Sequence, residues 1–110
     1  MTQKEKLVKF INGMKKGYKR CPKTIEWGFW NGDSSKPNAC CANGHAALGL
    51  TGDASNQTIA DELIDTISVF NQDGVGTVRL TYVIDTLVGY YNWTTPDVIK
   101  WLQSHADQMN

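Results

Sequence analysis

The amino-acid sequence predicts a mainly α-helical fold, either all-α or α+β. We expect a compact bundle of about five helices with a short strand or hairpin near residues 24–30. Apolar residues recur at helical spacing along most of the chain. Runs of glycine, proline and small polar residues separate those stretches. The 110 residues, 41% of them hydrophobic, suffice for one core and no more.

The N-terminal segment predicts an amphipathic helix over residues 3–16, and Gly17 suits the position just after its end. One apolar stripe runs along this segment, formed by Leu7, Phe10, Ile11 and Met14. A short strand is predicted over residues 24–30, because β-branched and aromatic side chains dominate there. The turn-forming residues of 31–38 predict a loop.

Small residues dominate the next predicted helix, residues 39–50, so the backbone of a neighbouring element can pack close to it. A shorter helix is predicted over residues 57–66, with Ser55 as its N-cap. The apolar side chains of residues 57–66 recur at helical spacing and are expected to be buried.

The C-terminal third predicts a loop over residues 68–76 and then a helix that begins at Thr77 and ends near residue 91. The β-branched content leaves open a strand over residues 78–87. The last helix is predicted over residues 94–108, because a hydroxyl residue, a proline and an acid stand in order at its start.

Residues 1–110 are expected to form a single domain, since no linker long enough to separate two domains interrupts the predicted elements. No apolar run approaches the roughly 20 residues that a transmembrane helix needs. The N-terminus lacks the pattern of a secretory signal, and three cysteines is an odd number. These features predict free thiols and a cytoplasmic protein that does not bind membranes.

The charges are unevenly distributed along the chain. Residues 1–36 carry nine Lys or Arg and three Asp or Glu, whereas residues 37–110 carry two and eight. One interpretation is that the two parts attract each other within the fold. The other is that the basic part binds an acidic partner.

The segment around Cys40, Cys41 and His45 is the strongest candidate for chemistry. Cys41 and His45 are four residues apart, so on a helix they share a face, and a helix N-terminus favours a thiolate. A Cys–His enzyme would use this pair, with Asn71 or Asp73 orienting the imidazole. The alternative is that the cysteines are small buried hydrophobes. No residue is therefore assigned as catalytic, and the protein is expected not to be an enzyme.

A zinc site is a third interpretation of the same segment. Cys21, Cys40, Cys41 and His45 are all potential ligands. Adjacent cysteines, however, do not have the spacing that presents two thiolates to one zinc ion. We therefore expect neither a metal nor another cofactor.

Basic and aromatic residues predict a surface that binds a partner. Trp27, Trp30 and Trp93 lie in or beside predicted loops, where tryptophan often serves as a protein-binding anchor. The basic candidates are Lys15, Lys16, Lys19, Arg20 and Lys23. The same basic residues would also suit a nucleic acid, although no nucleic-acid-binding motif accompanies them.

Residues 39–88 resemble a group of small phage and bacterial proteins of unknown activity. The resemblance rests on the run from Ala39 to Ala46, a short helix, an aromatic corner at residues 69–71 and a helix that begins with Thr77. The group often has a further cysteine where this chain has Lys36. What the resemblance implies is a small accessory protein encoded by a phage.

Together these observations predict a small intracellular accessory protein, encoded by a phage, that binds and inhibits or modulates a host protein, possibly one used in defence. In that case it would act in the host cytoplasm. The alternatives are a Cys–His-dependent hydrolase or transferase and a nucleic-acid-binding protein that uses its basic N-terminal third.

Overall fold

The computed structural model describes residues 1–26, 30–65, 67–72 and 76–109. Their helices are α1 (Gln3–Arg20), α2 (Ala42–Thr51), α3 (Gln57–Ile64), α4 (Leu80–Gly89) and α5 (Thr95–Gln108). Their strands are β1 (Trp30–Asp33), β2 (Lys36–Cys40), β3 (Ser68–Gln72) and β4 (Gly76–Arg79). The strands pair as two antiparallel hairpins, β1 with β2 and β3 with β4. The fold is mainly α with a small β content, as the sequence predicted.

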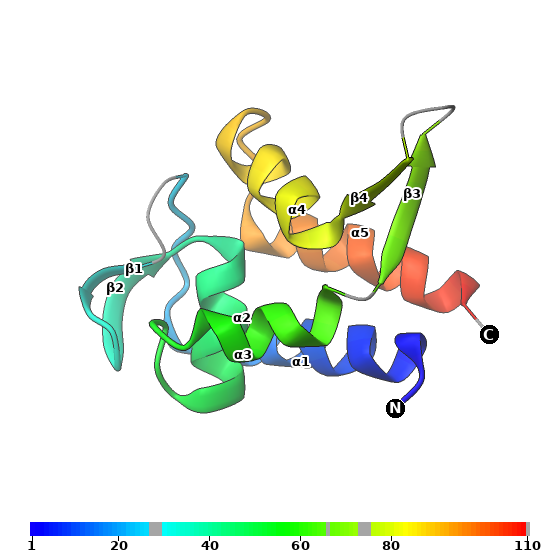
Figure 1. Cartoon of the computed structure of the whole chain (residues 1–110). Helices are drawn as coiled ribbons and strands as arrows, with labels where there is room; N and C mark the ends of the chain where they lie inside the picture. The colour runs from blue at the N-terminus through cyan, green and yellow to red at the C-terminus, as the bar shows by residue number, and fades with distance from the viewer. Residues whose placement is uncertain (27–29, 66, 73–75, 110) are drawn as a thin grey trace.

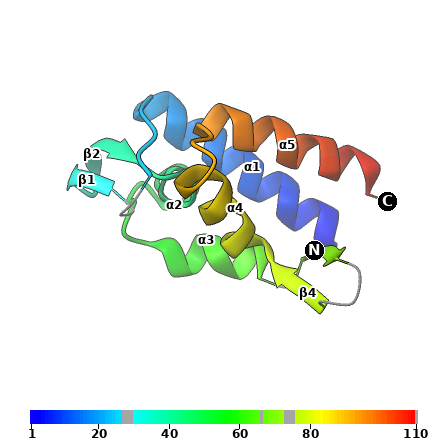
Figure 2. The same cartoon turned by 90° about the horizontal axis from the view of Figure 1, so that it is seen from above.

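The helices surround one apolar core. Figures 1 and 2 show α1 and α5 side by side and antiparallel, with α2, α3 and α4 packed around them and a hairpin projecting at each end. Lys4 Nζ donates to the main-chain oxygen of Met109 at 3.3 Å, so the two chain ends meet. The largest buried side chains come from all five helices and include Phe10, Leu48, Ile64, Ile84 and Leu102.

Helix α1 begins where the sequence predicted but continues past the predicted end at residue 16. A capping box between Thr2 and Glu5 starts it. Gly17 lies inside the helix and does not end it. A Cβ atom there would overlap the main-chain oxygen of His45 on α2, so glycine allows the two helices to approach closely. The helix ends one turn later, where the Cys21 amide donates to the Gly17 carbonyl at 3.0 Å.

Helices α1 and α2 cross with their backbones in close contact. A Cβ atom at Gly49 of α2 would overlap the main-chain oxygen of Gly13 of α1. The small-residue helix therefore packs close to a neighbouring backbone, as its composition predicted. Its N-terminal half is buried on all sides, from Ala42 through Leu48.

The first hairpin corrects the predicted strand and loop. Thr24 forms only an isolated bridge with Cys40, and residues 27–29 of the predicted strand lie outside the described residues. The segment predicted as a loop over residues 31–38 is a hairpin instead. Asp33 closes its turn by accepting hydrogen bonds from the amide and hydroxyl of Ser35 at 2.9 and 2.8 Å.

The second hairpin corrects the predicted loop over residues 68–76. Strands β3 and β4 pair across it, with Ser68 opposite Arg79. Thr77 therefore lies in a strand and does not start α4, which begins at Leu80 and ends at Gly89. The open choice between strand and helix is resolved at this boundary, since Leu80 and the residues four and eight positions later share the buried face of α4.

The starts of α3 and α5 differ in how well the sequence predicted them. The N-cap of α3 is Asn56, whereas the sequence predicted Ser55. The amide and hydroxyl of Ser55 instead donate to the Asp53 carboxylate in the preceding turn. Helix α5 follows Thr94, whose amide and hydroxyl both donate to Asp97, as the predicted start requires. Within the described part of the chain, no helix is long and apolar enough to cross a membrane.

The crossing of α1 and α2 predicts that Gly49→Ala destabilises the protein. The added methyl group must displace backbone rather than a flexible side chain, so we expect the free energy of unfolding to fall by about 3 kcal/mol or more. Urea unfolding followed by circular dichroism measures this. Asn12→Ala, at an exposed position of α1, is the control and should leave stability unchanged or slightly raised. Equal stability of Gly49→Ala and wild type would contradict the close crossing.

Candidate functional site

The two adjacent cysteines have different surroundings. Cys40 is the last residue of β2 and is fully buried beside Cys21 and Leu48. Cys41 is the N-cap of α2, and its Sγ accepts a hydrogen bond from the Gly44 amide at 3.3 Å. The thiol thus replaces the hydroxyl that usually caps a helix. The cap accounts for Cys41 as a structural residue.

His45 is fully buried, and both of its ring nitrogens have partners. Nε2 lies 2.7 Å from the Cys21 carbonyl oxygen, and Nδ1 lies 2.6 Å from Thr95 Oγ1. A carbonyl can only accept, so Nε2 carries the proton and the Thr95 hydroxyl donates to Nδ1. Thr24 Oγ1 in turn donates to Thr95 Oγ1 at 3.1 Å and accepts from the Thr95 amide at 2.9 Å. This network joins the C-terminal end of α1 and the first turn of α2 to the start of α5.

The electrostatics of the segment oppose an activated cysteine. Burial lowers the pKa of His45 to about 4, against a smaller opposite effect of its bond to Cys21. Burial raises the pKa of Cys41 to about 11. For Cys40, burial and the neighbouring Cys21 raise the pKa to about 12. At neutral pH the segment therefore holds a neutral imidazole and protonated thiols.

The candidates for a catalytic set are accordingly not arranged as one. The Cys41 thiol is engaged by its helix and both nitrogens of His45 are engaged by other groups. Asn71 lies in β3, but its side chain is outside the described part, as is the whole of Asp73. The residue that orients His45 is Thr95, which the sequence analysis used only as part of a helix start.

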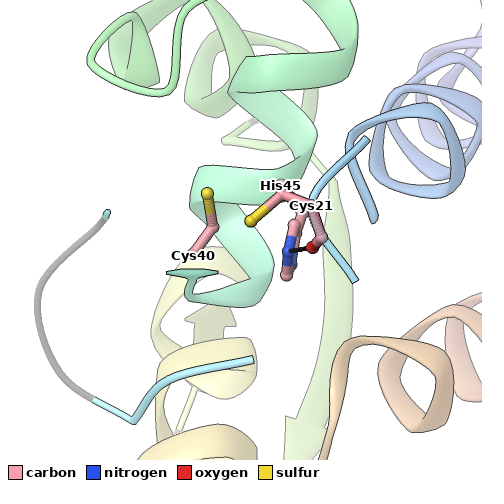
Figure 3. Close-up of side chains that lie close together, drawn as sticks. All are labelled: Cys21, Cys40 and His45. Carbon is pink, nitrogen blue, oxygen red and sulfur yellow. Dashed lines mark hydrogen bonds between the residues drawn. The ribbon is translucent and has the colours of Figure 1, made fainter. Parts of the chain in front are cut away.

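Three potential metal ligands do come together. The side chains of Cys21, Cys40 and His45 are all buried, and their ligand atoms lie within 4.8 Å of one another. Figure 3 shows the two sulfur atoms facing each other, with the imidazole beside them. Cys41, the fourth candidate from the sequence, is not a member of this group.

A second polar contact lies on the other side of α2. Asn43 is buried, and its Nδ2 donates to Asp85 Oδ1 at 2.8 Å. Asn43 Oδ1 is buried without a hydrogen-bond partner among the described residues. Burial, then Asp65 and Asp85, raise the pKa of Asp61 to about 6. Asp61 and Asp65 are four residues apart in the sequence, but Asp85 belongs to α4 and joins them only in the folded chain.

The basic candidates for partner binding are all exposed. They point in several directions: Lys15 borders a depression between α1 and α5, Lys16 borders a groove between α1 and α2, and Arg20 donates to the Ser35 carbonyl at 3.1 Å. Lys19 and Lys23 complete the exposed set.

The aromatic candidates differ from one another in exposure. Trp30 is 37% exposed on β1, whereas Trp93 is partly buried and packs edge-on against Trp101. Trp27 lies outside the described residues. The most exposed aromatics of the described residues are Tyr82, Tyr90 and Tyr91, none of which the sequence had indicated as a partner-binding residue. No periodicity marks them, because two of the three follow the end of a helix.

Comparison of the chain with protein-family models, with curated proteins and with solved structures gave no match. The resemblance of residues 39–88 to phage and bacterial proteins stays a prediction.

We predict that Cys41 reacts slowly with iodoacetamide in the folded protein. Its raised pKa leaves almost no thiolate at pH 7.5, and only the thiolate is nucleophilic. Mass spectrometry of the labelled peptide measures the rate, and the same chain in urea gives the rate for an exposed thiol. His45→Ala should not slow the labelling of Cys41 further. Fast labelling that depends on His45 would restore the Cys–His enzyme interpretation.

The low pKa of His45 predicts a loss of stability on acidification. The unfolded chain, with an ordinary pKa near 6.5, binds more protons than the folded chain between pH 6.5 and 4. The contribution of the neutral imidazole is complete above pH 6.5 and is lost as the pH falls through 4, a change of about 3 kcal/mol.

Asp61 acts in the opposite direction. Its raised pKa means that the folded state binds the extra proton between pH 6 and 3.8. The Asp61→Asn variant should therefore lose stability more steeply than wild type between pH 6.5 and 4.5 in urea unfolding. ¹⁵N NMR of the imidazole gives a direct check: titration of His45 near pH 6.5 in the folded protein would show the assignment to be wrong.

Proposed function

We propose that the protein acts by binding another protein, without catalysis of its own, and that the tyrosines of α4 and the following turn form the centre of the interface. Tyr82, Tyr90 and Tyr91 are 69%, 75% and 68% exposed, respectively. Large aromatic side chains bury more area than most residues, so leaving three in solvent forgoes stability. Tyrosine is also enriched at protein-binding sites.

These tyrosines are held on a well-ordered scaffold. Tyr82 and Thr86 lie four residues apart on α4, and Tyr90 is its C-cap, with an amide that donates to the Thr86 carbonyl at 2.9 Å, so all three lie on adjacent parts of one face. The turn after the helix is fixed by the Trp93 amide, which donates to the Leu87 carbonyl at 3.0 Å, and by Asn92 in a left-handed conformation. Figure 2 shows α4 uncovered on its outer side. Such anchors lose little entropy on binding.

Two depressions lie along α5, one reaching the turn after α4 and the other reaching α1. A depression of about 530 Å³ beside the turn is lined by Trp93, Asp97, Lys100, Trp101 and Ser104. A neighbouring one of about 390 Å³ shares Asp97 and Lys100 and reaches Lys15 and Tyr18 of α1. The hydrogen bonds from Thr94 lower the pKa of Asp97 and keep its carboxylate ionised, so Lys15 and Lys100 leave this area with one net positive charge. An aromatic surface with a basic edge suits an acidic protein partner.

The buried segment supports the non-catalytic part of the proposal. The thiols of Cys40 and Cys41 and the imidazole of His45 are neutral and lie in the core, where no substrate reaches them. The resemblance to phage and bacterial proteins adds a finer proposal. The partner is then a host protein, such as one used in defence, that is inhibited when its functional surface is covered.

The test begins with a photo-crosslinking amino acid at position 91, with position 59 as the control. Ile59 is 51% exposed on α3, on a different helix from the tyrosines. In a lysate of bacterial host cells, position 91 should capture a discrete protein that position 59 does not. That protein is then purified and its affinity measured by calorimetry.

The affinity measurement decides the proposal. The double variant Tyr90→Ser, Tyr91→Ser should bind at least about 30-fold more weakly, because the loss of even one central aromatic anchor costs about 2 kcal/mol. Ile59→Ser should bind as wild type does, and both variants should keep the wild-type circular dichroism spectrum. Undiminished affinity of the double variant would refute the tyrosine interface, and capture of nucleic acid alone would favour the nucleic-acid alternative.

A further inference from the structure

Three separate parts of the chain deliver metal-binding side chains to one buried point. Cys21 follows α1, Cys40 ends β2, and His45 lies in the first half of α2. Their ligand atoms lie within 4.8 Å of one another, and the three residues are 3%, 0% and 0% exposed (Figure 3). From this convergence we propose that Cys21, Cys40 and His45 bind one zinc ion.

The chemistry of the group favours a divalent ion that prefers sulfur and nitrogen. Two cysteines and one histidine are typical zinc ligands. When the two thiols lose their protons, two thiolates and one Zn²⁺ carry no net charge. Neutrality matters here because a net charge in a buried site is costly. A monovalent soft ion with the same ligands would leave one negative charge in the core.

His45 can release a nitrogen to the metal without leaving a buried group unpaired. The Cys21 carbonyl oxygen that now accepts from Nε2 also accepts from the Lys23 amide at 2.8 Å. Once Nε2 binds the metal, the imidazole proton moves to Nδ1, which then donates to Thr95 Oγ1. The Thr95 hydroxyl in turn donates to Thr24 Oγ1, 3.1 Å away. A histidine ligand held by a hydrogen bond from its other nitrogen is usual at metal sites.

The proton balance of binding is complete. Each thiol loses one proton to solvent, so one zinc ion replaces two protons. The imidazole stays neutral while its proton moves to the other nitrogen.

The adjacency of Cys40 and Cys41, which argued against zinc in the sequence, does not apply to this set. Its two thiols come from Cys21 and Cys40, while the Cys41 thiol caps α2.

The experiment uses the full chain, prepared with a phosphine reductant and freed of metal by a chelator. Zinc is added and the bound metal is counted by mass spectrometry after gel filtration. We expect one ion per chain, two protons released per ion, and a raised melting temperature. Cobalt(II) in place of zinc should give the intense near-ultraviolet absorption of two cobalt–thiolate bonds.

Matched serine variants identify the ligands. Cys21→Ser should weaken zinc binding at least 100-fold and halve the cobalt–thiolate absorption. Cys41→Ser, whose hydroxyl still caps α2, should leave both unchanged. An equal loss in the two variants, or full binding by Cys21→Ser, would overturn the assignment.

The wild-type protein also tests the proposal by itself, in case Cys21→Ser does not fold. ¹⁵N NMR should show the His45 proton on Nε2 without zinc and on Nδ1 with it. A cobalt(II) spectrum without thiolate absorption, or an unchanged His45 tautomer at saturating zinc, would refute the site.

Discussion

The backbone contact between α1 and α2 is the constraint on which the rest of the structure depends. At Gly13, Gly17 and Gly49 the two helices lie closer than side chains would allow. This contact places the main chain of His45 against Gly17, and Cys21 follows Gly17 by about one helical turn. The His45 ring can therefore reach the Cys21 carbonyl, and Cys40 comes in from β2 beside them. A bulkier residue at Gly17 or Gly49 would meet backbone atoms of the other helix and move these groups apart.

A segment with the residues of a reactive site has surroundings that disfavour a reactive thiolate. An active cysteine needs an ionised or ionisable sulfur, a base with an available nitrogen and access for substrate. Here burial raises the pKa of both thiols, both nitrogens of His45 have partners, and all three side chains are buried. The polar atoms of this segment hold α1, α2 and α5 together. A metal ion suits such a place better than a substrate, since it needs ligands and no cleft.

The sequence was sufficient for features that depend on local pattern and insufficient for those that depend on packing between distant segments. The apolar stripe of α1 and the hydroxyl–proline–acid start of α5 are local, and both were predicted. Gly17 suits a helix end in the sequence, because a glycine that ends a helix and one that permits a close crossing look alike there. The sequence pattern predicted Thr77 as a helix start because a hydroxyl residue before an apolar stripe is typical of one, whereas the structure pairs it with Asn71, six residues earlier, in a hairpin. The link from Thr95 to His45 spans fifty residues, and no motif encodes it.

The residues that suggest chemistry in the sequence are buried in the fold, and the most exposed aromatic residues belong to no sequence motif. The residues with the most characteristic motif, Cys40, Cys41 and His45, are in the core, whereas Tyr82, Tyr90 and Tyr91 form no motif and are the most exposed aromatics among the described residues. A reactive side chain in a core can be explained by stability alone, because cysteine packs as a small hydrophobe and a neutral histidine joins two hydrogen bonds. Three exposed tyrosines on one helix and its turn add little to stability, so folding does not explain them. Under the proposed function, burial of their rings by a partner would account for both their number and their position on α4 and the turn after it.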